Sequence, residues 1–169
     1  MEWAEFSAAL AAFLGAHVVP MRLRGPLVAR LGRRAYVLGY SLLSLGLLYW
    51  LIVAAGRAPW VEIWPQEPWM RWAVNLAMPV AFLLAATGGM AGLMAAFTLW
   101  AGTHLLANGD LAHVLLFGIL LSYALLGLAI GLRRGLRLVI SWQRVALALL
   151  LWAGLFHLHP LVIGVSPAP

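Results

Sequence analysis

The sequence contains no cysteine and no lysine, and it has few acidic residues. The lack of cysteine excludes disulfides, thiolate metal sites and the covalent attachment of a c-type haem. Only 9% of the 169 residues are charged, whereas 64% are hydrophobic. A soluble domain of this length needs many more charged groups to cover its surface. We therefore expect an integral membrane protein whose main partner is the lipid bilayer.

The basic residues are all arginines, and they give the chain a formal net charge of +6. In a soluble protein such an excess would suggest binding to nucleic acid. A membrane protein needs it instead for its cytoplasmic loops, so we predict no nucleic-acid partner. The sequence also lacks a Walker loop, a dinucleotide-binding fingerprint, an HExxH motif and a nucleophile elbow. No carboxylate lies within a predicted helix core, which argues against a proton-driven pump.

Six apolar segments come close to the length of roughly 20 residues that a helix needs to cross a bilayer. They are residues 3–19, 36–55, 72–88, 90–107, 111–132 and 140–158. We expect Pro20 to end the first helix. We place the break between the third and fourth at Gly88-Gly89, because glycine tolerates the backbone angles of a tight turn. The competing count is five helices plus a re-entrant segment.

Charge placement favours six helices with the N-terminus outside. The connections between the first two and the last two helices carry most of the arginines: Arg22, Arg24, Arg30, Arg33, Arg34, Arg133, Arg134 and Arg137. All five acids fall on the other side, as the positive-inside rule requires. Four tryptophans within residues 60–72 indicate a belt at the membrane surface on that side. The predicted fold is thus an all-α integral membrane bundle.

Histidines are the main candidates for function, since an ionisable side chain inside a membrane is costly. Trp100, His104 and Asn108 recur at four-residue spacing and therefore share one helix face. A neutral imidazole at His104 can bind haem iron or another metal, relay protons, or bond a backbone carbonyl across the bundle. These alternatives stay open from the residues alone.

The sequence Asn108-Gly109-Asp110 predicts a turn between two helices. We expect Gly109 to adopt a left-handed conformation that ends one helix, and Asp110 to cap the next. His113 then falls in the first turn of the following helix. A supporting role for Asp110 and His113 at a neighbouring site remains open.

Three further histidines lie near helix ends. His17 lies on a face rich in small residues, which suits close helix packing and also leaves room for a planar cofactor. His157 and His159 are two residues apart, so at most one of them serves a site with His104. We expect His159, which precedes Pro160, to lie outside helical geometry.

Four stretches of the chain resemble the NnrU family of bacterial inner-membrane proteins, which is associated with nitrogen-oxide metabolism. They are residues 30–55 (RLGRRAYVLGYSLLSLGLLYWLIVAA), 63–86 (IWPQEPWMRWAVNLAMPVAFLLAA), 99–118 (LWAGTHLLANGDLAHVLLFG) and 159–167 (HPLVIGVSP). Together they cover most of the chain, and LWAxxHLLANGD is the most specific block. The resemblance implies a location in the bacterial cytoplasmic membrane.

The NnrU family is similar to plant zeta-carotene isomerase, a membrane enzyme that holds a b-type haem between histidines. The resemblance implies a haem-binding bundle with His17 at the position of one axial ligand. The isomerase's second ligand lies in an Arg-His-Pro motif, which would fall at residues 90–92 and is missing here. Met90 or Met94 can then ligate opposite His17, or His104 can pair with His157. A five-coordinate iron and a chain without haem are the remaining alternatives.

Three hypotheses for function follow from the resemblance and the histidines. The leading one is a b-type haem protein that senses nitric oxide or nitrite, or assists a nitrogen-oxide reductase. The second is a haem-dependent isomerase of a polyene or carotenoid-like lipid. The third is a cofactor-free scaffold or assembly factor for another membrane protein. Whether the chain is an enzyme stays open.

Overall fold

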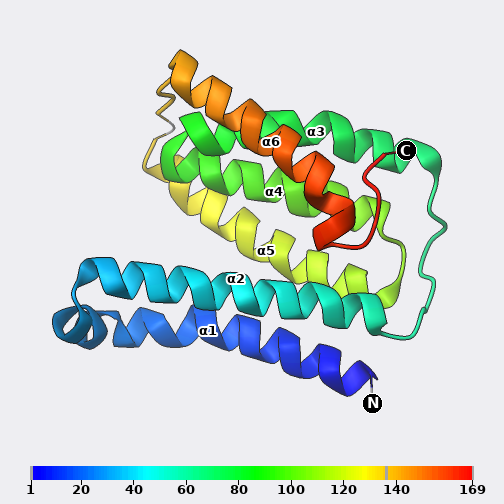
Figure 1. The fold of residues 1–169 in the computed structure, drawn as a ribbon, viewed down its shortest axis with the longest axis horizontal. Helices are drawn as coiled ribbons and strands as arrows, with labels where there is room; N and C mark the ends of the chain where they lie inside the picture. The colour runs from blue at the N-terminus through cyan, green and yellow to red at the C-terminus, as the bar shows by residue number, and fades with distance from the viewer. Residues whose placement is uncertain (1, 136, 169) are drawn as a thin grey trace. The chain divides into compact units, whose positions relative to one another are not determined.

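A computed structural model describes residues 2–135 and 137–168, without the side chains of residues 18–22. The described residues form α-helices and no strand, which confirms the all-α prediction (Figure 1). The helices are α1 (Glu2–Leu31), α2 (Arg33–Arg57), α3 (Pro68–Thr87), α4 (Gly89–Ala107), α5 (Leu111–Arg133) and α6 (Trp142–Val162). They divide into two compact units, Met1–Trp60 and Val61–Pro169.

Helices α2 to α6 are each long and apolar enough to cross a membrane, among the residues that the structure describes. Their outer surfaces are apolar too: Leu42 is 70% exposed and Leu161 is 82% exposed. Water would not tolerate so many exposed large apolar side chains, whereas lipid does. The chain is therefore a multi-pass membrane protein. A crossing by α1 and an outside N-terminus stay predictions.

The first unit is a helical hairpin of α1 and α2 (Figure 1). Phe6, Ala9 and Phe13 recur at helical spacing on α1 and are buried, as are Leu51 and Ala54 on α2. Near the open end of the hairpin, the Glu5 carboxylate accepts hydrogen bonds from Arg57 and from the Trp50 indole, each at 3.4 Å. The hairpin is thus held by buried apolar contacts between the two helices and by the hydrogen bonds of Glu5 near its open end.

The prediction that the first helix ends at Pro20 is wrong. Helix α1 continues to Leu31, and the single residue Gly32, with a φ of 78°, separates it from α2. A proline removes one backbone hydrogen bond, and helices in apolar surroundings tolerate that loss. Most of the predicted arginine-rich loop is consequently helical.

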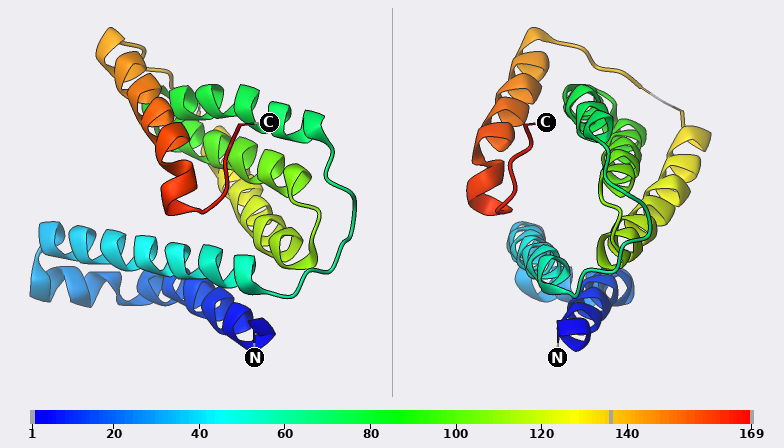
Figure 2. Two further views of the ribbon diagram at one scale, coloured as in Figure 1. Left: turned by 45° about the vertical axis from the view of Figure 1, so that its right-hand side comes forward. Right: turned by 90° about the vertical axis from the view of Figure 1, so that its right-hand side faces the viewer.

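In the second unit, α4 packs between α3 and α5, and α6 packs against α3 (Figures 1 and 2). The predicted break at Gly88-Gly89 is confirmed, because α3 ends at Thr87 and α4 begins at Gly89 with a φ of 57°. A Cβ on Gly88 would collide with the backbone of Gly92 and Leu84. The α3–α4 turn is therefore tight enough to require glycine.

Small residues bring α4 and α5 together, as is usual where helices pack within lipid. The Met94 side chain lies over Gly127, and the Ala91 backbone lies over Gly131. A Cβ at either glycine would press on the facing helix. This close packing fixes the direction of α4, and therefore the position of the residues at its C-terminal end.

A short extended segment, residues 61–64, is bound to the turn between α4 and α5. The Ile63 N–H donates to the Gly109 carbonyl at 2.7 Å, and the Leu111 N–H donates to the Val61 carbonyl at 2.8 Å. The Trp64 indole N–H donates to the Leu106 carbonyl at the end of α4, at 3.1 Å. We call residues 61–64 the strap. It ties the start of this unit to the α4–α5 turn.

Candidate functional site

His104 lies in the last turn of α4 and is half-buried. Its Nδ1 lies 2.9 Å from the Trp100 carbonyl oxygen. A carbonyl can only accept, so the imidazole donates through Nδ1 and carries its lone pair on Nε2. This is the tautomer in which a histidine offers one nitrogen to a metal while the backbone holds the other.

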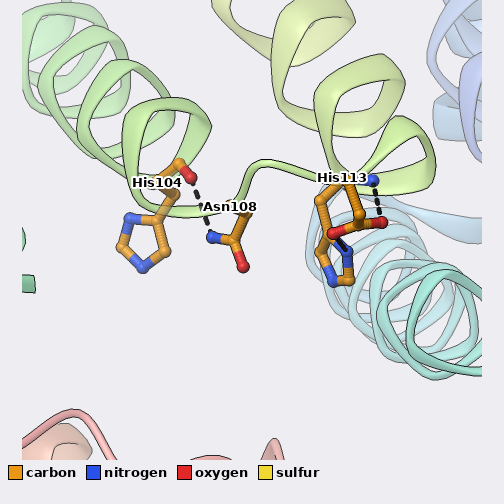
Figure 3. Close-up of polar contacts among 4 residues, drawn as sticks. His104, Asn108 and His113 are labelled. Atoms are coloured by element: carbon orange, nitrogen blue, oxygen red, sulfur yellow. Dashed lines mark hydrogen bonds and ion pairs between the residues drawn. The ribbon is translucent and has the colours of Figure 1, made fainter. Parts of the chain in front are cut away.

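The predicted shared face of α4 is confirmed by these contacts. Trp100 accepts from the His104 ring, and the Asn108 amide donates to the His104 carbonyl at 2.8 Å (Figure 3). The Phe117 ring of α5 lies 5.3 Å from the His104 ring and 5.4 Å from the Trp100 ring, between centroids. The imidazole is therefore oriented by the backbone and lined by two aromatic rings.

Asp110 caps α5, as predicted. Its Oδ1 accepts from the His113 backbone N–H at 3.3 Å, and its Oδ2 accepts from the His113 ring Nδ1 at 2.6 Å (Figure 3). Asp110 is 3% exposed. In Figure 3 the rings of His104 and His113 lie apart, with Asn108 between them. His113 therefore has its own carboxylate partner and is not part of the His104 contacts.

The left-handed conformation predicted for Gly109 is wrong, since its φ is not positive and Asn108 ends α4 in an extended conformation. Glycine is required there for another reason. A Cβ on Gly109 would collide with the carbonyl oxygen of Trp64 in the strap. The strap therefore occupies the space that a side chain at residue 109 would need.

His159 lies within α6, so the prediction that it leaves helical geometry before Pro160 is also wrong. Pro160 removes the N–H that would bond to the Phe156 carbonyl, and α6 continues to Val162 despite this loss. The His159 ring Nδ1 donates to the Val165 carbonyl at 2.7 Å, which bends the C-terminal segment back along the helix. The Asn75 amide of α3 holds the same segment through the Pro167 carbonyl, at 2.8 Å.

The two histidines at the end of α6 differ in exposure and in partners. His157 is exposed, and its ring meets the Phe156 ring edge-on at 5.6 Å between centroids. His159, by contrast, has its ring bonded to the Val165 carbonyl.

A family model described as NnrU protein matches residues 5–167, which is nearly the whole chain. The chain belongs to the NnrU family. No curated protein and no solved structure matches it.

In this NnrU-family chain, the methionines suggested as iron ligands lie far from His104. Met90 is 14 residues and Met94 is 10 residues before His104 on α4. At 1.5 Å of rise per residue, these separations are about 21 Å and about 15 Å along the helix. Neither methionine can share an iron with His104. Met90 is 66% exposed, and the Met94 side chain is engaged with Gly127.

His17 belongs to the Met1–Trp60 unit. Its Nδ1 donates to the Phe13 carbonyl at 2.8 Å, and its ring centroid lies 4.4 Å from that of Phe13. The Tyr40 ring of α2 lies 6.2 Å away. His17 and His104 thus share the same Nδ1-to-carbonyl arrangement, each within its own unit. A shared role for His17 with Met90 or Met94 stays a prediction.

No group of three or more His, Cys, Asp or Glu side chains within the described part of the chain is placed to hold a metal ion. A haem differs from such a site, because its iron needs only one or two protein ligands.

Two residues of this region were not predicted from the sequence. The sequence predicts Trp64 in the surface belt, yet its indole N–H bonds to the end of α4. Asn75 of α3 holds the C-terminal segment through its side-chain amide. An uncharged amide in a predicted apolar helix was the only signal for Asn75. Trp60, Trp69 and Trp72 are exposed, in keeping with the predicted belt.

Proposed function

We propose that this NnrU-family protein binds a b-type haem in the bacterial inner membrane and supports nitric oxide or nitrite metabolism. It does so by sensing these compounds or by assisting a nitrogen-oxide reductase. The nitrogen-oxide assignment rests on the family's association, and the haem rests on the site around His104. The two parts are tested separately.

The observation that carries the haem proposal is the hydrogen bond from His104 Nδ1 to the Trp100 carbonyl. It leaves Nε2 as the ligating nitrogen and fixes the plane of the ring, as the outer contacts of metal-bound histidines do. The described residues give Nε2 no hydrogen-bond partner. Trp100 and Phe117 add flat aromatic surface next to the imidazole, which suits a planar macrocycle.

His159 supports the same proposal from α6. Because its Nδ1 donates to Val165, its lone pair also lies on Nε2. His104 and His159 therefore offer the same nitrogen from two helices of one unit. His104, alone or together with His159, would hold the haem iron through Nε2. A bound haem supplies an iron that takes up nitric oxide and transfers single electrons.

The protein's own residues orient the imidazole and keep water away. Asn108, bonded to the His104 carbonyl, and the strap, bonded to Leu106, hold the last turn of α4. The surfaces of α4, α5 and α6 are largely apolar. A low dielectric strengthens iron ligation by a neutral imidazole relative to hydration of the separated groups.

The test of haem binding is an absorption spectrum of the detergent-purified protein, made with added haem, before and after reduction by dithionite. The proposal expects a Soret band at one haem per chain, with sharp α and β bands on reduction if two histidines ligate. A monodisperse protein with no absorbance above background would contradict haem binding and favour a scaffold role.

A separate test addresses the nitrogen-oxide role. Deletion of the gene in a denitrifying host should alter growth or nitrite accumulation only under nitrogen-oxide respiration, and the unaltered gene should restore it. If the phenotype is unchanged but the protein contains haem, the haem proposal stands and the nitrogen-oxide role is contradicted.

An apolar groove bears on the alternative of a polyene isomerase. It has a volume of about 540 Å³ and is lined by Trp64, Pro65, Glu67, Trp69, Met70, Gly102, Leu105 and Leu106. Such a groove suits a lipid-soluble molecule. At about 100° of rotation per residue, however, His104 lies about 200° around α4 from Gly102. The groove and the His104 ring are on different faces, so we keep the haem-protein proposal.

A further inference from the structure

The Val61–Pro169 unit has a second cavity, at the opposite end of α4 from His104. Its volume is about 230 Å³. Gly88 and the first residues of α4, Gly89 to Ala91, form one wall, and Ile130 and Gly131 of α5 form another. Arg134 and Arg137 complete the lining, just beyond the end of α5. The cavity therefore combines two arginines with an otherwise small or apolar wall.

These two arginines have no carboxylate partner within the described part of the chain. The ion pairs there involve only Arg57 with Glu5 and His113 with Asp110. The acids of this unit lie at its other end: the backbone of Glu62 forms a β-bridge with that of Asp110 beside the α4–α5 turn, and Glu67 precedes α3. The length of α4, about 28 Å, separates the two ends. The positive charge at the cavity is therefore not balanced by the protein.

A nearby arginine, Arg144, does have a partner in the protein. Arg144 donates to the Ala86 carbonyl at 3.1 Å and so satisfies the C-terminal end of α3. Arg134 and Arg137 make no such hydrogen bond among the described residues. Their guanidinium donors are available to an anion, and guanidinium binds phosphate oxygens through paired hydrogen bonds.

The first backbone amides of α4 add to the positive potential at the cavity. The first N–H of α4 with an acceptor within the helix turn is that of Gly92, which donates to the Gly88 carbonyl at 2.9 Å. The preceding amides of Gly89, Met90 and Ala91 line the cavity and carry the positive end of the helix dipole. These amides supplement the arginines, whose full charges contribute more of the positive potential.

The rim of the cavity is apolar and faces outward. Met90 is 66% exposed and Ile130 is 46% exposed. In a bundle that spans a membrane, these side chains lie against acyl chains. A phosphate joined to an acyl tail would meet both the arginines and this rim, whereas a free phosphate would meet the arginines alone.

We propose that this cavity binds the phosphate headgroup of an anionic phospholipid, with Arg134 and Arg137 as its main ligands. Basic pockets between membrane helices are suited to such headgroups, because their charge adds to the hydrophobic placement of the lipid. The bound lipid bridges α4 to the loop that follows α5. This site is independent of haem binding at His104.

The test compares the full-length protein in neutral-lipid nanodiscs that contain either phosphatidylglycerol or only phosphatidylcholine, with bound lipid counted by native mass spectrometry. We expect phosphatidylglycerol to remain bound on ejection and to be retained about tenfold less by the R134Q/R137Q variant. The R33Q/R34Q variant removes the same charge from exposed residues outside the cavity. It should change retention less than twofold.

Ile130→Trp is a second variant that fills the cavity without changing the charge. It should reduce phosphatidylglycerol retention as R134Q/R137Q does, while the protein remains monodisperse. Inorganic phosphate at millimolar concentration should not displace the lipid. Equal losses in R134Q/R137Q and R33Q/R34Q, full retention in Ile130→Trp, or displacement by phosphate would each overturn the proposal.

Discussion

Asp110 binds His113 twice, once through the backbone N–H at 3.3 Å and once through the ring Nδ1 at 2.6 Å. One carboxylate thus caps α5 and orients a histidine in the first turn of that helix. Asp110 lies directly before α5, and the Phe117 ring of α5 lies against the His104 ring. The cap therefore holds the aromatic wall of the candidate site.

Replacing Asp110 with alanine should lower the stability of the second unit by about 1–2 kcal/mol, because the cap and the His113 partner are both lost. Asp110→Asn keeps an oxygen for the backbone N–H and should cost less. Thermal unfolding in detergent measures both variants. Equal melting temperatures for Asp110→Ala and the unaltered protein would show that the cap contributes nothing.

Gly109→Ala should release the strap, because the new Cβ would collide with the Trp64 carbonyl. We expect faster proteolysis within residues 58–67 and a lower melting temperature. Gly118→Ala is the matched control, since a Cβ on Gly118 meets nothing within 4 Å. It should leave stability unchanged or raise it by up to about 1 kcal/mol. Indistinguishable behaviour of the two variants would contradict the strap contact.

Gly127→Leu should separate α4 from α5, because its side chain would need the space held by Met94. Overpacking of this kind typically costs about 1–3 kcal/mol. Gly154→Leu on α6 makes the same change where a Cβ meets no neighbour within 4 Å. Thermal unfolding should distinguish the two. A Gly127→Leu protein as stable as Gly154→Leu would mean that α4 and α5 are not closely packed.

Asn75→Leu should free the C-terminal segment from α3, since its amide is the donor to the Pro167 carbonyl. Amide hydrogen exchange of residues 163–168 should become faster, with little change elsewhere in α3. Ser122→Ala removes a hydroxyl that bonds only within α5 and should not alter that exchange. Slow exchange in Asn75→Leu would show that another contact holds the segment.

Local signals predicted helix ends well where the capping residues were distinctive. Helix α4 was expected at residues 90–107 and lies at Gly89–Ala107, and α5 was expected at 111–132 and lies at Leu111–Arg133. Glycine, asparagine and aspartate specify these ends through their own backbone. Proline predicted them poorly: α1 passes Pro20 and α6 includes Pro160, because apolar surroundings keep the remaining helical hydrogen bonds intact.

Such local signals do not predict contacts between residues that lie far apart in the sequence. Trp64 donates a hydrogen bond to Leu106, 42 residues later in the sequence, and Asn75 donates one to Pro167, 92 residues later. Both depend on how whole helices pack, which no short pattern encodes. The face shared by Trp100, His104 and Asn108 was predicted correctly because it follows from helical periodicity alone. The place of His159 within α6 needed the structure, since α6 was expected to end before that residue.

The most direct test of the account is the haem spectrum of two matched variants, His104→Ala and His157→Ala. Both remove an imidazole from a helix of the same unit, but only His104 has its Nδ1 held by a backbone carbonyl next to two aromatic rings. The account predicts that His104→Ala loses the Soret band while remaining monodisperse, and that His157→Ala retains it at full stoichiometry. A Soret band that survives in His104→Ala with unchanged position and amount would contradict His104 as an iron ligand.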